Sequence, residues 1–316
     1  MEIIRYKKIY IGISALLVVL SIVALSVFGL KEGMDFTGGS LWEIKVTGIP
    51  QQEAQQKITD AFKKEKITNF NLQPTDAGGY LIRFPHISED THQTLKTSIE
   101  ELNITNSEVI GETLNVTGSQ AKIEEVQFES VGPSIGSELR DKAYVSLVLV
   151  IIFIVIYVAW AFRKVSLPVA SWKYGLVTVV ALTHDVLIPA GIFAVLGHFL
   201  GYEVDTLFVT ALLTILGFSV HDTIVVFDRI RENLIRHKSD PFDRIVNRSM
   251  NDTLARSINT SLTAIIVLAS LFIFGGASIK NFVLTLILGI FFGTYSSIFL
   301  ASPLLVVWHE RGIKKA

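Results

Sequence analysis

One carboxylate lies deep inside an apolar stretch of this chain. Residues 204–227 read VDTLFVTALLTILGFSVHDTIVVF, and Asp222 is the acidic side chain within its second half. About 9 Å of helix separates it from the charged residues that begin at Asp228. A charge in the hydrocarbon core of a bilayer costs about 2.5–3.5 kcal/mol on insertion scales. Such a group usually persists because it binds, pairs with or transfers an ion, so Asp222 is predicted to be functional.

Arg256, at the start of the next apolar stretch, is the predicted partner of Asp222. Successive spans are antiparallel, so the two residues are expected to meet near the same membrane surface. Burial favours the neutral form of a carboxyl group, and a nearby guanidinium favours its charged form. The pair is therefore predicted to act as an ion-coupling switch, with a static ion pair as the alternative.

A second carboxylate, Asp185, follows His184 in the preceding apolar stretch. It is predicted to share the ion-coupling role or to lie at a helix end caused by Pro189. His184 and His221 are candidates for tuning the carboxylates beside them, because imidazole titrates near neutral pH. Helix packing accounts for the other polar residues of these stretches: Ser257, Thr260, Ser261, Thr263, Thr294, Ser296 and Ser297.

Two other kinds of chemistry fit this pattern poorly. An aspartyl protease dyad would share one proton between Asp185 and Asp222, but the Gly-x-Gly-Asp signature of membrane proteases is absent before Asp222. A metal site would need both members of each His–Asp pair, and adjacent residues on a helix diverge by about 100°. We therefore predict no catalytic residues, no metal and no cofactor beyond a coupling ion.

The composition indicates a membrane protein. Half of the 316 residues are hydrophobic and only 18% are charged, which is unusual for a soluble domain. The net charge of −1 gives no reason to expect nucleic acid as a partner, and the lack of cysteine excludes disulfides. Six apolar segments are long enough to span a bilayer: residues 10–30, 143–162, 174–199, 204–227, 257–274 and 282–308.

Lysine and arginine predict the orientation. They precede the first span, separate the second from the third, crowd residues 228–251 and close the chain, whereas the links near 201–203 and 275–280 contain only Lys280. Both termini are therefore predicted to be cytoplasmic, with residues 228–251 as a basic connection between spans. The first span could instead be a cleaved signal peptide, but about twenty apolar residues favour a permanent anchor.

Residues 31–140 are predicted to form a separate domain outside the membrane. Strand, helix, two strands, helix and strand are expected over 40–47, 51–65, 67–72, 80–84, 88–102 and somewhere within 108–130. This order is typical of a ferredoxin-like α+β domain. Residues 1–30 then form a tail and first helix, 141–308 a five-helix membrane domain, and 309–316 a second cytoplasmic tail.

Two glycine-rich runs flank this domain. Gly33-Met34-Asp35-Phe36-Thr37-Gly38-Gly39 follows the first span, and Val131-Gly132-Pro133-Ser134-Ile135-Gly136 precedes the second. Both are predicted to be hinges, since glycine and proline do not continue a strand comfortably; a ligand loop is the alternative for the first. His86 and His92 are isolated from other metal-binding residues and are predicted to face solvent.

Several of these stretches resemble the SecF family, the smaller partner in SecDF protein-export complexes of the resistance-nodulation-division superfamily. The similarity rests on the two glycine-rich runs, on ALTHDV at 181–186 and on GFSVHDTIVVFDRIREN at 217–233. It also includes RSINTSLT at 256–263 and GIFFGTYSSIF at 289–299, and so extends in order over nearly the whole chain.

The resemblance implies a polytopic inner-membrane protein that assembles with SecD beside the SecYEG channel. A proton or sodium gradient would then drive late translocation of unfolded preproteins on the extracytoplasmic side. Asp222 and Arg256 match the ion-responsive aspartate and partner arginine of the family, whereas His221 replaces the usual asparagine. The alternatives are a subunit of an efflux or lipid transporter of the same superfamily, and a passive scaffold of the translocon.

Overall fold

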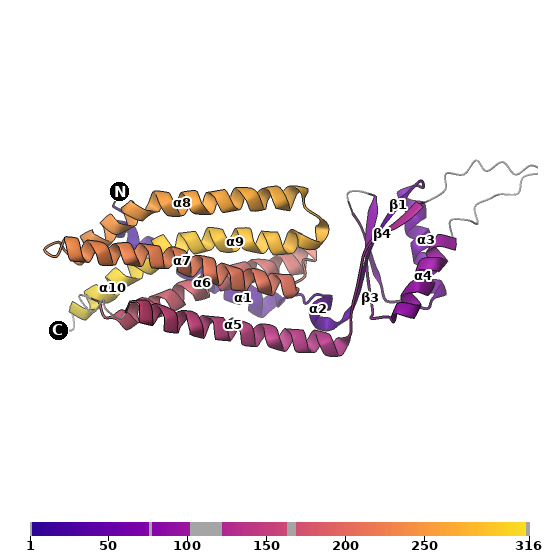
Figure 1. The fold of residues 1–316 in the computed structure, drawn as a ribbon, viewed down its shortest axis with the longest axis horizontal. Coiled ribbons are helices and arrows are strands. Elements are labelled where there is room, and N and C mark those ends of the chain that lie inside the picture. The colour runs from indigo at the N-terminus through magenta and orange to yellow at the C-terminus, as the bar shows by residue number, and fades with distance from the viewer. Residues whose placement is uncertain (1, 76–77, 102–121, 163–168, 314–316) are drawn as a thin grey trace, which may run out of the picture. The chain divides into compact units, whose positions relative to one another are not determined.

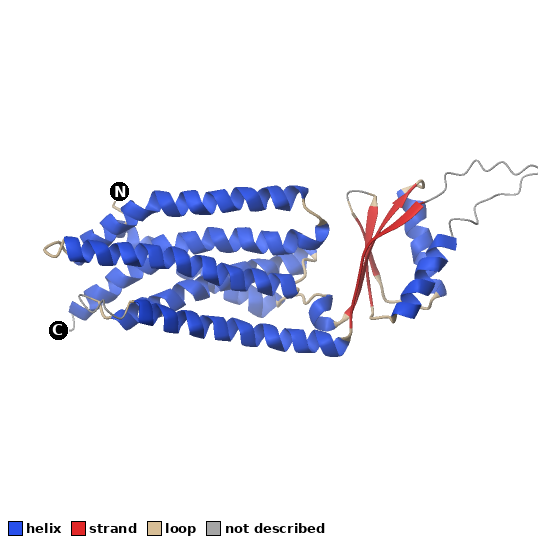
Figure 2. Ribbon diagram, in the orientation of Figure 1, coloured by secondary structure: helices blue, strands red, loops and turns tan. Residues whose placement is uncertain are grey.

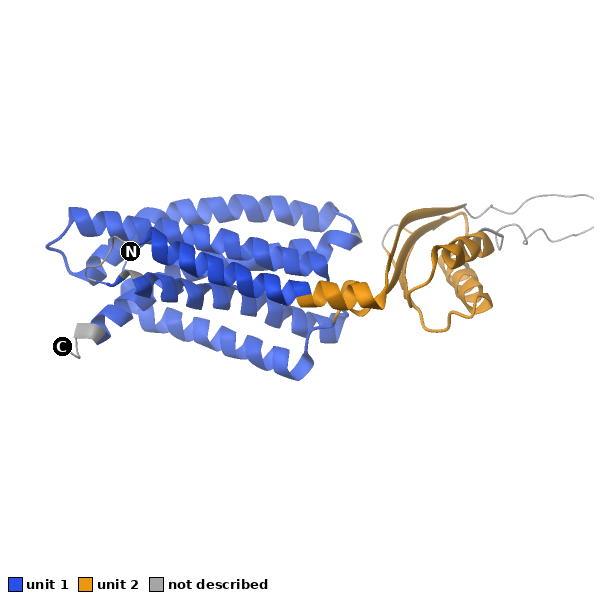
Figure 3. Cartoon of the chain, turned by 60° about the horizontal axis from the view of Figure 1, so that its bottom comes forward, with its two compact units in different colours: residues 1–31, 142–316 blue, residues 32–141 orange. Residues whose placement is uncertain are grey.

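The protein divides into two compact units (Figure 3). The computed structural model describes residues 2–75, 78–101, 122–162 and 169–313. One unit comprises Met1–Lys31 and Lys142–Ala316, and the other comprises Glu32–Asp141. The predicted domain limits of 31 and 140 each differ from these by one residue.

The first unit is built from long helices (Figure 1). They are α1 (Lys7–Phe28), α5 (Pro133–Ala161, of which residues 142–161 belong to this unit), α6 (Ser171–Leu200), α7 (Thr206–Arg236), α8 (Phe242–Phe274), α9 (Lys280–Ser296) and α10 (Ser302–Ile313). Short 3₁₀ turns precede α1 and α9 (η1, Ile4–Tyr6; η2, Ala277–Ile279), and a π-helical segment, η3 (Ser297–Ala301), joins α9 to α10. In the described part of the chain, six helical segments are long and apolar enough to cross a membrane, with α9, η3 and α10 forming the sixth. The predicted multi-pass architecture is confirmed.

Most of the basic connection predicted over residues 228–251 is helical. α7 continues to Arg236 and α8 begins at Phe242, so only residues 237–241 turn the chain. Ion pairs support the two extensions: Arg229 contacts Glu232 at 2.7 Å and Asp252 of α8 at 2.7 Å. This charged sequence forms a helical hairpin because its charged side chains pair within each helix and between the two helices. The predicted tail at 309–316 is likewise helical up to Ile313.

Pro189 does not end α6, so the predicted helix end beside Asp185 is wrong. The helix runs without interruption from Ser171 to Leu200 with Pro189 inside it. Proline has no N–H, and the carbonyl that would have accepted it four residues earlier is that of Asp185. Proline is tolerated here because a helix buried among others can satisfy the freed backbone group in other ways.

α7 packs against α6, α8, α9 and η3. Two glycines of α9 permit this close approach. A Cβ on Gly289 would lie 2.1 Å from the Cδ1 atom of Ile215, and one on Gly293 would lie 3.1 Å from the Cβ of Ser219. Their four-residue spacing places both glycines on one face of α9, an arrangement that commonly lets membrane helices approach closely.

Both ends of the helical unit's chain lie beside the α7–α8 turn (Figure 1). Lys7 forms an ion pair with Glu310, which joins α1 to α10. The backbone N–H of Ile4 donates to Oδ1 of Asn247 in α8 at 3.2 Å. The two termini and this turn therefore share one end of the helical unit.

The second unit is a four-stranded antiparallel sheet with helices on one face (Figure 2). Its strands are β1 (Gly39–Thr47), β2 (Asn71–Pro74), β3 (Gly79–Phe84) and β4 (Lys122–Val131), in the spatial order β2-β3-β1-β4. The covering helices are α3 (Gln51–Lys64) and α4 (Glu89–Glu101). This is the predicted ferredoxin-like topology. The strand predicted at 67–72 is displaced to 71–74, and the predicted last strand lies partly outside the described residues.

His92 is buried in this unit, at 2% exposure, so the prediction that it faces solvent is wrong. Its ring stacks on Phe128 of β4 at 3.5 Å and meets the edge of Trp42 of β1 at 5.2 Å. One ring nitrogen lies 3.3 Å from Glu89 and the other 3.2 Å from Glu125. Hydrogen bonds from Gln93 and His92 hold the pKa of Glu89 below its usual value. His86 is exposed, as predicted.

The two glycine-rich runs pack against each other within the second unit, and their role as hinges stays a prediction. Residues Met34–Thr37 form the short helix α2, which buries Phe36. Gly38 has a φ of +77°, and a Cβ there would lie 2.8 Å from the backbone of Pro133. Pro133 and Gly136 belong to the first turn of α5, where proline is favoured because its missing N–H needs no partner.

Candidate functional site

Asp222 lies inside the helical unit, with 8% of its surface exposed. Its two carboxylate oxygens accept hydrogen bonds from different elements. Ser257 of α8 donates to Oδ1 at 2.6 Å, and Ser297 of η3 donates to Oδ2. The carboxylate thus ties α7 to the two elements on either side of it. The sequence-based prediction that Asp222 is a buried acid is supported by this placement.

Arg256 does not contact Asp222, so the predicted ion pair is wrong for this structure. Arg256 is exposed, and among the described residues it forms no ion pair. The reason is helix geometry: adjacent residues diverge by about 100°, and Ser257 occupies the inward position. Asp222 is therefore held by hydroxyl groups and not by a cation.

Asp185 is fully buried and has three side-chain partners. Its Oδ2 accepts hydrogen bonds from Ser219 of α7 and from Ser296 of α9, the latter at 2.8 Å. Its Oδ1 lies 2.8 Å from Nδ1 of His184, the preceding residue of α6. The other ring nitrogen of His184 is buried without a partner in the described part of the chain, and the ring stacks near Tyr295 at 6.2 Å.

Four serines that bind these carboxylates were not predicted as functional residues. Ser257, Ser296 and Ser297 were assigned to helix packing, and Ser219 was not singled out. Serine is common at helix interfaces, so its presence alone carries little information. Ser257 could have been identified from its position next to Arg256, the residue that was predicted to be the partner of Asp222.

A polar stripe runs along the exposed face of α7 and another along that of α8. On α7 the stripe repeats at intervals of three or four residues; its members are Thr210, Thr214, Gly217 and His221. On α8 the matching residues are Arg256, Asn259, Thr260 and Thr263. Both stripes occupy apolar segments that could span a membrane. His221 thus faces outward and does not touch the site around Asp222.

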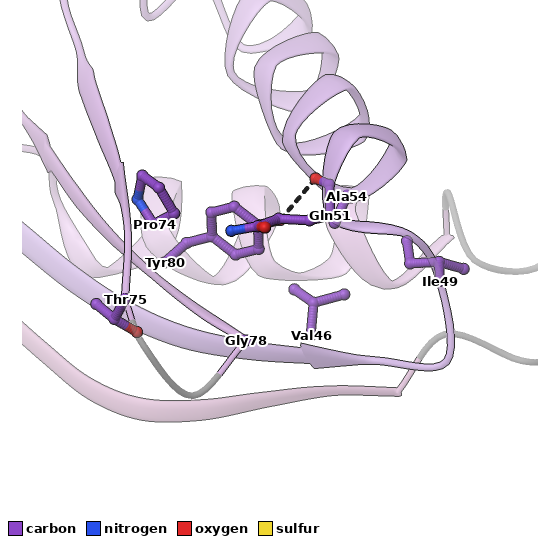
Figure 4. Close-up of a pocket in the computed structure, with 8 residues that line it drawn as sticks. All are labelled: Val46, Ile49, Gln51, Ala54, Pro74, Thr75, Gly78 and Tyr80. Carbon is purple, nitrogen blue, oxygen red and sulfur yellow. Dashed lines mark hydrogen bonds between the residues drawn. The ribbon is translucent and has the colours of Figure 1, made fainter.

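No cluster of metal-binding residues exists in the described ranges. A cavity of about 400 Å³ lies in the second unit between the start of α3 and the β2–β3 connection (Figure 4). The hydroxyl of Tyr80 forms part of its wall and donates to the carbonyl of Gln51 at 2.7 Å. Burial raises the pKa of Tyr80, and the described lining holds no carboxylate, histidine or lysine. The paired carboxylates of the helical unit are the stronger candidate site.

Comparison with known proteins relates the chain to protein export. The family model "Protein export membrane protein SecD/SecF, C-terminal" matches residues 110–311. The protein translocase subunit SecF of Thermobaculum terrenum is 42% identical, over 98% of this chain and 94% of its own length. That of Anaerolinea thermophila is 33% identical over all of this chain and 99% of its own length.

A solved structure extends the similarity to the fold. The crystal structure of SecDF, a translocon-associated membrane protein from Thermus thermophilus, superposes with a TM-score of 0.75 at 29% identity. The match covers 98% of this chain but only 38% of that one, so the chain spans about two fifths of the solved protein.

Proposed function

The chain belongs to the SecF family of protein translocase subunits, and from this premise we propose that it uses an ion gradient to promote late preprotein translocation. The coupling residue is Asp222, with Asp185 as a second carboxylate of the same site. The coupling ion is a proton or a sodium ion. The protein acts by conformational change and not as an enzyme, and it needs no other cofactor.

The hydroxyl partners of Asp222 carry this proposal. A serine hydroxyl can donate to a charged carboxylate and can accept from a protonated one. Ser257 and Ser297 can therefore satisfy Asp222 in both states, whereas a fixed guanidinium would satisfy only the charged state. A buried acid that remains hydrogen-bonded in both states can exchange its cation without a large penalty for unpaired groups.

The energy of a gradient is sufficient for such an exchange. One elementary charge moving through about 100 mV releases about 2.3 kcal/mol. That amount is close to the insertion cost of about 2.5–3.5 kcal/mol for a charged aspartate at mid-membrane. A single uptake or release at Asp222 can therefore shift a two-state arrangement of α7, α8 and η3.

The polar stripes of α7 and α8 support a partner within the membrane, which we propose to be SecD. Threonine hydroxyls of the stripes bond to their own helices, but an imidazole and a guanidinium are costly against lipid, so such faces are normally covered by protein. His221 and Arg256 would then face the partner. A protein of Thermus thermophilus named protein translocase subunit SecDF is 33% identical to this chain, over 90% of this chain's length.

The end of the helical unit that holds both termini fits the cytoplasmic face of the inner membrane. Arg5, Lys7, Arg244 and Arg248 gather at this end, and basic residues favour the cytoplasmic side. The α+β unit would then lie outside, where SecYEG releases the unfolded preprotein. Contact with SecYEG and with the preprotein is part of the same proposal.

The test is preprotein translocation into vesicles that hold this protein with its SecD, with the gradient imposed or collapsed. We expect Asp222→Asn to abolish the stimulation by the gradient while the protein still copurifies with SecD. Asp228→Asn is the matched control, because Asp228 lies on the same helix but is exposed, and its one ion pair among the described residues is with Arg231 at 3.6 Å. It should retain the stimulation.

Gradient stimulation that survives in Asp222→Asn would refute ion coupling at this residue. A passive scaffold makes a different prediction: removing the protein would then impair translocation equally with and without a gradient. Exchanging proton for sodium gradients in the wild-type vesicles identifies the coupling ion.

A further inference from the structure

Asp185 and Asp222 belong to one closed ring of polar contacts. Ser219 lies one helical turn before Asp222 on α7, and its hydroxyl donates to Asp185. Ser296 donates to Asp185 and its neighbour Ser297 donates to Asp222. The two carboxylates are therefore linked twice, once through α7 and once through two consecutive residues where α9 passes into η3.

The backbone at this second link is irregular. Residues Ser297–Ala301 are π-helical, inside a span that is otherwise α-helical. The side chain of Ser302 donates to the carbonyl of Ser297 at 3.2 Å. Single π-turns within α-helices are often found at functional sites, because the widened turn weakens the regular hydrogen bonding. The irregular turn begins at the residue that binds Asp222.

We propose that Ser296 and Ser297 are positioning residues that couple the charge states of Asp185 and Asp222 to the form of the π-helical segment. This inference rests on the proposed function, in which Asp222 takes up and releases a cation. Because the two serines are neighbours in one backbone segment, a change at either carboxylate reaches the other. The segment thus makes the two acids respond as a pair.

The coupling follows from the alternatives open to Ser297. When Asp222 is charged, the hydroxyl of Ser297 donates to it. The same hydroxyl already lies 3.0 Å from the carbonyl of Thr294, one turn earlier. When a proton from the gradient forms an O–H bond on Asp222, that acid becomes a donor, and Ser297 can turn fully to Thr294. Asp222 then donates to the oxygen of Ser297, so the hydrogen bond between α7 and η3 reverses its direction, and release of the proton restores the first arrangement.

Other ionisable groups lie on Asp222's own helix and on the elements packed around it. Asp185 and His184 lie on α6, Arg256 on α8 and His221 on α7 itself. Tyr295 of α9 and Tyr10 of α1 also lie close, with the hydroxyl of Tyr295 donating to the carbonyl of Tyr10 at 3.3 Å. Of these, Asp185 is the residue that contacts the serine pair directly.

The pH dependence of translocation tests the coupling. In SecD-containing vesicles, Ser297→Ala removes one donor to the charged form of Asp222. The pH midpoint of gradient stimulation should rise by about half to one pH unit. Ser297→Thr, which keeps a hydroxyl, should restore the midpoint. Ser270→Ala on α8 is the matched control, since Ser270 is exposed and its hydroxyl donates to the carbonyl of Ile266 in its own helix.

Ser296→Ala gives the discriminating result. Ser296 contacts Asp185 but not Asp222, so the midpoint should shift in this variant only if the two acids are coupled. Hydrogen exchange of residues 297–308, corrected for intrinsic rates, should differ several-fold between pH 5 and pH 8 in the wild type and not in Ser297→Ala.

The outcomes separate this inference from the proposed function. If Asp222→Asn loses gradient stimulation but Ser296→Ala and Ser297→Ala keep the wild-type midpoint, the coupling is wrong and the function stands. If Asp222→Asn keeps gradient stimulation, the proposed function itself fails. Exchange of residues 297–308 that is equal at both pH values would also overturn the coupling.

Discussion

A carboxylate held by hydroxyl groups differs in kind from one held by a guanidinium. Asp222 accepts from two serines, and Asp185 from two serines with a histidine beside it. These partners can reverse their hydrogen bonds when the acid changes its charge. An arginine cannot do so, because it has donors only. At the scale of single residues, this site favours exchange over a permanent ion pair.

Arg256 is expected to act at the partner surface and not in the stability of this chain. It is exposed and lacks an ion pair among the described residues, so Arg256→Met should change the unfolding free energy of the purified chain by less than about 0.5 kcal/mol. The same variant should copurify with less SecD, because its outward face loses a charge. Thermal unfolding in detergent and pull-down yields measure the two effects.

Arg236→Met is the control, since Arg236 pairs with Glu232 at 2.6 Å near the α7–α8 turn. It should leave SecD binding unchanged. A large loss of stability in purified Arg256→Met, with normal SecD binding, would contradict the assignment of Arg256 to the partner surface.

The sequence identified the acids of the site but not their partners. Asp222 stands out because a charge is costly in an apolar run. Ser257 and Arg256 are neighbours, and only the rotation of α8 decides which of them points inward. Ser296 and Ser297 lie where α9 passes into the π-turn of η3, and such a turn has no clear sequence signature. The burial of His92 was missed for a similar reason, since the aromatic rings that cover it come from strands β1 and β4.

At the scale of elements, the contact of α7 with α9 holds the site together. Gly289 faces Ile215 so closely that any side chain at this position must displace it. Gly293 likewise brings α9 up to Ser219, which is bonded to Asp185. The approach of these two helices thus sets the distances on which the polar ring depends.

Gly289→Ala is expected to destabilise the protein by about 1–3 kcal/mol, because the added methyl group overpacks a tight contact. Gly217→Ala is the control on α7, where a Cβ would meet nothing within 4 Å. It should be neutral or slightly stabilising, since alanine favours a helix over glycine. Thermal unfolding of the purified chain compares the two.

A second variant checks the cause. Ile215→Ala, combined with Gly289→Ala, provides space for the new methyl group and should recover part of the lost stability. If the two losses simply add, the contact between Gly289 and Ile215 is not what the alanine disturbs.

The existence of most elements could be predicted from the sequence, whereas several of their ends could not. Apolar length gives the six spans, and alternation with helical spacing gives the order of the ferredoxin-like unit. The extensions of α7 and α8 beyond the apolar residues are missed because the spans were delimited by their apolar residues alone. Ion pairs such as Arg229 with Asp252 explain why those charged residues remain helical.

At the scale of the whole molecule, the sidedness of the chain can be tested directly. The sequence contains no cysteine, so a single introduced cysteine reports only its own position. In right-side-out vesicles, Gln52→Cys in the α+β unit should react with a membrane-impermeant maleimide. Ser239→Cys in the α7–α8 turn should react only after the vesicles are opened. Both side chains are exposed in the structure.

The reverse labelling pattern would place both termini outside and would refute the proposed orientation. Labelling of both cysteines from one side would contradict a membrane crossing between them. Charge distribution predicts this orientation, but the fold alone does not determine it, because a helical bundle has the same packing in either direction.

The hairpin formed by α7 and α8 has a mechanical consequence. Its first arm has 31 residues, which is about 46 Å of helix for a hydrocarbon layer of about 30 Å. Asp222 lies about 21 Å of helix before Arg236, so a stiff rod pivoting by about 10° at Asp222 would move that end through about 4 Å. Small rearrangements around the buried acids would thus produce larger displacements of residues 237–241 at the membrane surface.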